Sequence, residues 1–113
     1  MPLDLTYVTI HTELQAQWSG GKVLRSMTFK NVLHVSARER PFVLIVEPWA
    51  DEFTIAVGDD CKVVALNPGV SPTFEVEPCR GCDLIIYVNE SGSTFEFWRS
   101  GVREFWTSVA IPG

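Results

Sequence analysis

Short stretches of alternating apolar and polar residues run along this chain and are separated by turn residues, a pattern that predicts β-strands. The alternation is clear at residues 3–10, 53–57 and 73–77. Residues 42–46 and 84–88 are instead apolar at every position. Runs this short and this rich in β-branched side chains are typical of central strands, so we expect both to be covered on two faces.

The N-terminal third is harder to interpret. Thr12 and Gln15 have the spacing of a capping box, which predicts a helical turn that must end by Gly20. Residues 23–29 and 32–36 predict one long strand with a bulge between them. Residues 61–66 predict a further strand before the turn signal Asn-Pro-Gly at 67–69.

Residues 95–106 predict a β-hairpin that carries five aromatic side chains. Because strand side chains alternate between two faces, Trp98 must lie opposite Phe95 and Phe97. A three-residue loop with Gly101 in a bulge would pair Trp98 with Val102, whereas a two-residue loop would pair it with Arg103. Either register places aromatic side chains on both faces of the hairpin.

Together these segments predict an all-β fold, a sandwich of two antiparallel sheets with about eight or nine short strands. A small closed barrel is the alternative. The length of 113 residues fits one domain spanning 1–113. The predicted core consists of Phe42, Leu44, Ile45, Phe74, Val76, Ile85 and Phe97.

Aromatic side chains on the second face of the hairpin need a cover, because an exposed tryptophan forgoes roughly 1.5–3 kcal/mol of burial. Three covers are consistent with the sequence for Trp98 and Trp106. Residues 12–18 could pack over them, a second subunit could bind there, or a ligand could stack on the rings.

The net charge of −5 makes nucleic acid an unfavourable partner, since phosphate binding needs a basic surface. The sequence contains no run of about 20 apolar residues, which is the length that a helix needs to span a bilayer. No secretory segment is apparent either. Three cysteines do not form a secreted disulfide framework. These observations favour a cytoplasmic protein without membrane contact.

Cys79 and Cys82 form a Cys-x-x-Cys pattern around Gly81. Such a pair can hold zinc, but the chain offers only Cys61 and scattered histidines as further ligands. The same spacing can serve redox chemistry, or the cysteines can simply fill a turn. We expect the last of these, with no metal and no cofactor.

Residues 47–52 place three carboxylates and Trp49 at a turn between strands. Paired carboxylates can act as acid and base or hold a cation, yet a turn with a packed tryptophan is the simpler interpretation. Nothing resembles a nucleophile elbow, a P-loop or a dinucleotide-binding glycine run. The sequence does not argue for an enzyme.

The segment 41–53 has a Pro-Phe strand followed by Glu47, Pro48, Trp49 and Asp51. It resembles a segment of small uncharacterised bacterial all-β proteins. The resemblance covers about a tenth of the chain, implies a compact bacterial β-sandwich and carries no activity with it.

We therefore expect a non-enzymatic interaction or oligomerisation module that forms a homodimer. The candidate interface or ligand residues are Trp49, Trp98, Arg103 and Trp106. One alternative is a small-molecule or carbohydrate-binding protein that uses the tryptophans. The other is a zinc-binding protein that uses Cys79, Cys82 and Cys61.

Overall fold

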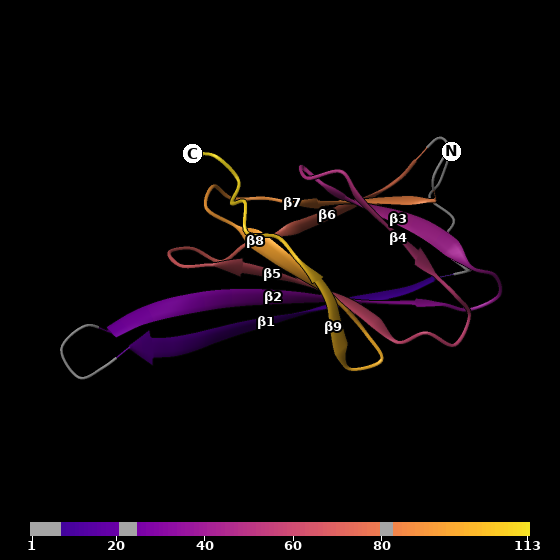
Figure 1. Cartoon of the computed structure of the whole chain (residues 1–113), viewed down its shortest axis with the longest axis horizontal. Helices are drawn as coiled ribbons and strands as arrows, with labels where there is room; N and C mark the ends of the chain where they lie inside the picture. The colour runs from indigo at the N-terminus through magenta and orange to yellow at the C-terminus, as the bar shows by residue number, and fades with distance from the viewer. Residues whose placement is uncertain (1–7, 21–24, 80–82) are drawn as a thin grey trace.

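The computed structural model describes residues 8–20, 25–79 and 83–113 and contains nine β-strands in that part of the chain (Figure 1). No helix long and apolar enough to cross a membrane occurs in these ranges. The strands are β1 (Val8–Gly20), β2 (Arg25–Ala37), β3 (Phe42–Glu47), β4 (Asp51–Ile55), β5 (Cys61–Asn67), β6 (Phe74–Pro78), β7 (Leu84–Val88), β8 (Thr94–Arg99) and β9 (Val102–Trp106).

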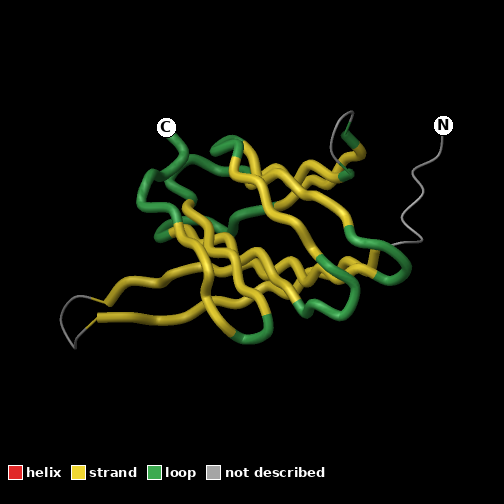
Figure 2. The backbone as a smooth tube through the Cα atoms, turned by 45° about the vertical axis from the view of Figure 1, so that its right-hand side comes forward, coloured by secondary structure: helices red, strands yellow, loops and turns green. Residues whose placement is uncertain are grey.

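The strands form two sheets that pack face to face, so the predicted β-sandwich is confirmed (Figure 2). The five-stranded sheet has the order β1-β2-β5-β8-β9 and the four-stranded sheet the order β4-β3-β7-β6. Among the described strands, β1, β9, β4 and β6 each have one neighbour, so neither sheet closes into a barrel. Strands β3 and β7 pair in parallel, and all other neighbours are antiparallel.

The β1–β2 hairpin extends beyond the strand that pairs with it, β5. Its two 13-residue strands pair without a register shift, while β2 pairs with β5 only from Phe29 to Val35. The rest of the hairpin projects as an arm (Figure 1). The predicted helical turn at Thr12–Gln15 and the predicted bulge at Lys30 and Asn31 are therefore both wrong.

The reason for this correction lies in the sequence pattern. Residues 13–18 read Glu-Leu-Gln-Ala-Gln-Trp and alternate with the period of a strand. A capping box defines only a helix start and brings no apolar helical face with it. The cross-strand ladder with β2 therefore prevails over the local helix signal.

The core fills the space between the sheets. Phe97 stacks on Phe53 with ring centroids 4.1 Å apart, and Phe42 and Leu44 are fully buried. Of the other predicted core residues, Phe74 and Val76 are half-buried and pack against this core. Ile45 and Ile85 are half-buried on the outer faces of β3 and β7.

Strands β3 and β7 show why the prediction of two covered faces is wrong. Their burial alternates residue by residue between full and partial. One face of each strand meets the other sheet, and the opposite face belongs to the outer surface of a two-layer fold.

The β8–β9 hairpin turns through the two residues Ser100 and Gly101. Both have positive φ, 50° and 79°, as a type I′ turn requires. Trp98 consequently pairs with Arg103, which is the register of the two-residue loop. Glu104 is the extra residue of a bulge next to this pair.

The strand order also decides between the proposed covers of the hairpin. Strand β1 lies at one edge of the five-stranded sheet, and β9 lies at the other. Because β2 and β5 separate β1 from β8, residues 12–18 cannot pack over Trp98 or Trp106. That cover is excluded, which leaves a second subunit or a ligand as the alternatives.

Candidate functional site

Four side chains of the β8–β9 hairpin form one group on the outer face of the five-stranded sheet. We call this group the β8–β9 face; it consists of Glu96, Trp98, Arg103 and Trp106. Trp98 Nε1 donates to Glu96 Oε1 at 3.0 Å. Arg103 Nη1 binds the other oxygen of the same carboxylate, Oε2, also at 3.0 Å. Glu96 thus orients both an indole and a guanidinium.

Each indole of this face also has a cation over its ring. Lys62 Nζ lies 4.8 Å from the centroid of Trp98, and Arg103 Cζ lies 4.4 Å from the centroid of Trp106. Cation–π contacts of this kind contribute about 0.5–1 kcal/mol at exposed sites. They also occupy one side of each ring, which makes stacking of a sugar on that side less favourable.

The exposure of the face increases toward the sheet edge. Trp98 is half-buried on β8, whereas Trp106 on the edge strand β9 is 58% exposed. Val102 on the same strand is 62% exposed but pairs with Arg99, so it lies on the other side of the sheet. A large apolar side chain exposed on an edge strand is a typical feature of interaction surfaces.

Two small adjacent cavities lie beside Trp98, where β8 meets β5 and β2. Each has a volume of about 120 Å³, and they share His34, Lys62 and Trp98. Val32 and Val64 line one of these cavities. Both are only 5% exposed, although they alternate with core residues along their strands and therefore belong to the outer face of the sheet. These residues were not identified from the sequence. Strand parity relative to the core residues Leu33 and Val63 would have placed them on the outer face.

Trp49 is not part of this group. Its ring lies 4.8 Å from that of Phe95, and its Nε1 donates to the Val109 carbonyl at 2.6 Å. Phe95 faces the core from β8, while Trp98 lies on the other side of the same strand. The structure therefore brings Trp98, Arg103 and Trp106 together and places Trp49 on the opposite side of the sheet.

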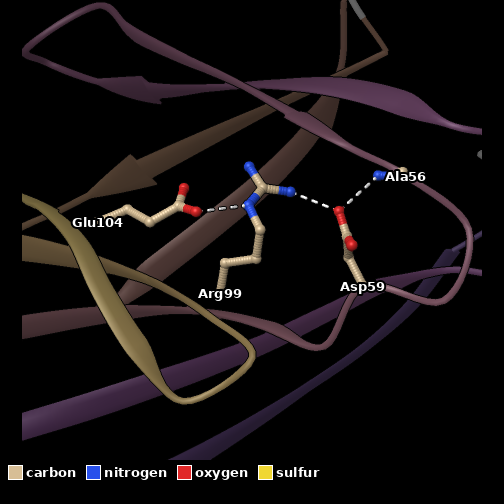
Figure 3. Close-up of polar contacts among 4 residues, drawn as sticks. All are labelled: Ala56, Asp59, Arg99 and Glu104. Carbon is tan, nitrogen blue, oxygen red and sulfur yellow. Dashed lines mark hydrogen bonds and ion pairs between the residues drawn. The ribbon is translucent and has the colours of Figure 1, made fainter.

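Arg99 fixes the hairpin that carries the face to the rest of the fold (Figure 3). Its guanidinium binds Asp59 and, through Nε, Glu104 at 2.9 Å. Asp59 also accepts a bond from the Ala56 amide, and the backbone amide of Ser100 donates to the Asp60 carbonyl at 2.7 Å. The Ala56 hydrogen bond, and then Arg99, hold the pKa of Asp59 below its usual value.

The cysteines give no support to a metal site. Cys61 is a free thiol buried in the core, and burial raises its pKa to about 11. Cys79 is disulfide-bonded, and Cys82 lies outside the described residues. Within the described ranges, no three His, Cys, Asp or Glu side chains are grouped to hold a metal ion. Glu47, Asp51 and Glu52 are therefore not part of such a group.

Comparison with known proteins gives no further indication of function. No family model matches the chain, and neither a curated protein nor a solved structure resembles it significantly. The resemblance of residues 41–53 to bacterial all-β proteins stays a prediction. The function must therefore be argued from the surface itself.

Proposed function

We propose that this protein is an interaction module that forms a two-fold homodimer through the β8–β9 face. The observation that carries the proposal is the exposure of Trp106 on an edge strand, beside Arg103. Tryptophan and arginine are the residues most enriched at the energetic centres of protein interfaces. A tryptophan that is 58% exposed gains most of its burial only when a partner covers it.

A second copy is the favoured partner because the face carries both signs of charge. In a two-fold interface the same patch meets itself, so each cation needs an anion within its own patch. The β8–β9 face offers Arg103 as the cation and Glu96 as the anion. Rotated by a dyad, these groups can pair across the interface and fix its register.

Analytical ultracentrifugation of the full chain tests the dimer. The wild-type protein should sediment as a dimer at micromolar concentration, and Trp106→Glu and Trp98→Glu should each give a folded monomer. Val70→Glu is a matched control, because Val70 is an exposed apolar residue on the β5–β6 turn, 46% exposed, away from this face. That variant should remain dimeric.

Two results would overturn the proposal. The first is a wild-type protein that is monomeric at high micromolar concentration. The second is a dimer that Trp106→Glu and Trp98→Glu leave intact while circular dichroism shows both variants to be folded. In the second case another surface joins the subunits.

A further inference from the structure

A cavity of about 470 Å³ lies at the opposite layer of the sandwich, at the end of the four-stranded sheet where β3 and β7 terminate. Its volume is within the range of about 300–1,000 Å³ that is usual for small-molecule sites. The lining combines apolar and polar residues: Pro48, Val88 and Ile111 with Glu47, Tyr87, Asn89, Glu90 and Ser91.

The charges among the described lining residues are all negative. Glu47 and Glu90 contribute two carboxylates, and no described lysine, arginine or histidine lines the cavity. Within the described part of the chain, neither of the two forms an ion pair. Two carboxylates left without a cation at one small cavity create a local field that attracts positive charge.

An aromatic ring lies between carboxylates on the same sheet. Tyr87 is the register partner of Glu47 on β3 and of Glu75 on β6. Asn89 Nδ2 lies 3.5 Å from Glu75 Oε1 at the edge of the same row. Carboxylates beside an aromatic ring are the groups that recognise organic cations, through charge-assisted hydrogen bonds and cation–π attraction.

Hydrogen bonds connect the segments around the cavity, so its shape does not depend on the closure of a loop. The amide of Gly92 donates to the Ile111 carbonyl at 2.8 Å, and the amide of Ile111 donates to the Ser93 carbonyl at 2.9 Å. Asn67, only 3% exposed, donates from Nδ2 to the Ser91 carbonyl at 2.9 Å. A site held in this way loses little conformational entropy on binding.

The backbone of Glu90 has a conformation that is unusual for a residue other than glycine. Its φ of 86° lies in the left-handed region, which glycine adopts freely and other residues rarely adopt. The Ser93 amide donates to the Glu90 carbonyl at 3.2 Å, so this conformation belongs to the turn that follows β7. A carboxylate is present at a position where glycine would fit the backbone better, and that carboxylate lines the cavity.

We propose that this cavity binds a small organic cation, an amidinium, guanidinium or primary ammonium group attached to an apolar body. The charged group pairs with Glu47 and Glu90 beside Tyr87. The apolar body lies against Pro48 and Ile111. The site is on the other sheet from the β8–β9 face and does not depend on the homodimer.

A titration of the ¹⁵N-labelled protein with benzamidine tests this site. The cationic probe should bind saturably and shift the amide signals of residues 87–91 and Ile111. Benzamide has nearly the same shape without the charge and should bind at least tenfold more weakly. Glu47→Gln and Glu90→Gln should each weaken benzamidine binding about tenfold, as expected for loss of a charge-assisted hydrogen bond.

Two further variants complete the experiment. Glu77→Gln removes a carboxylate from the same sheet outside the lining and should leave the affinity unchanged. Glu90→Gly removes the carboxylate from a backbone position that suits glycine, so the variant should stay folded and bind as weakly as Glu90→Gln. Equal affinity for benzamide and benzamidine would overturn the proposal. So would an absence of saturable binding, or unchanged binding by the folded Glu47 and Glu90 variants.

Discussion

Phe97 contributes to stability through its position between the two sheets. Its side chain is fully buried and stacks on Phe53 at an interplanar angle of 12°. Phe97→Ala would remove this contact and leave a cavity that the surrounding sheets cannot fill. We expect a loss of about 3–5 kcal/mol in the free energy of unfolding, measured by urea denaturation.

Val102→Ala is the control for that measurement, because Val102 is 62% exposed on the edge strand. Its free energy of unfolding should change by less than about 0.5 kcal/mol. An unchanged denaturation midpoint for Phe97→Ala would show that the hairpin does not direct this ring into the core.

Asp59 should make the stability sensitive to acid. Its pKa is lowered in the folded protein by the Ala56 amide and by Arg99, so protonation favours the unfolded chain. The stabilisation is complete above the ordinary value of 3.8 and is lost as the pH falls through the lower folded pKa. Asp59→Asn should remove this part of the pH dependence.

The measurement is the free energy of unfolding of both proteins between pH 7 and pH 3. The wild-type protein should be the more stable one at pH 7, and the difference should shrink toward pH 3. Asp60→Asn is the control, because Arg99 pairs with Asp59 and Glu104 and not with the Asp60 side chain, while the Asp60 carbonyl accepts the Ser100 amide. A constant difference between wild type and Asp59→Asn across this range would contradict the prediction.

At the scale of elements, the type I′ turn sets the register of the β8–β9 hairpin. Gly101 has a φ of 79°, and a Cβ added there would meet no atom within 4 Å. Gly101→Ala therefore introduces conformational strain without a clash. We expect a loss of about 1–2 kcal/mol in the free energy of unfolding, the usual cost of a left-handed alanine.

Gly69→Ala provides the comparison. A Cβ at Gly69 would be 3.9 Å from Asn67 Oδ1, and no positive φ applies there. This variant should be as stable as the wild-type protein or slightly more stable, because alanine has fewer unfolded conformations than glycine. A larger loss from Gly69→Ala than from Gly101→Ala would mean that backbone conformation does not govern the hairpin turn.

The elements that the sequence predicted best are those with clear alternation and flanking turns. Strands β3 to β9 match the predicted segments closely, because their periodicity is short-range information. Strand β1 was missed over Thr12–Gln15, where a local capping signal competed with a pairing that depends on β2. The half-burial of Ile45 and Ile85 was also missed, since it depends on which layer covers each face.

For the whole molecule, we expect no structural zinc. Cys61 is a buried thiol with a pKa raised to about 11, so it is not a thiolate at neutral pH, and Cys79 is disulfide-bonded. Protein purified without added metal should contain no stoichiometric zinc by elemental analysis. A chelator should leave its melting temperature unchanged, and a loss of fold on chelation would contradict this expectation.

The disulfide at Cys79 also bears on the predicted cytoplasmic location. Disulfides are common in oxidising compartments and rare in the cytosol. The odd number of cysteines had argued against a disulfide framework, but three cysteines still allow one bond and one free thiol. This bond gives the cytoplasmic prediction no support.

The sequence by itself determined the all-β class, most strand positions and the two faces of the terminal hairpin, because alternation along one strand is a local property. Only the tertiary structure decided which strands are neighbours. That order separated residues 12–18 from Trp98, placed Trp49 on the core side and gathered Glu47, Tyr87 and Glu90 at one cavity. Such contacts join residues far apart along the chain, and their partners are chosen by packing between sheets rather than by neighbouring residues.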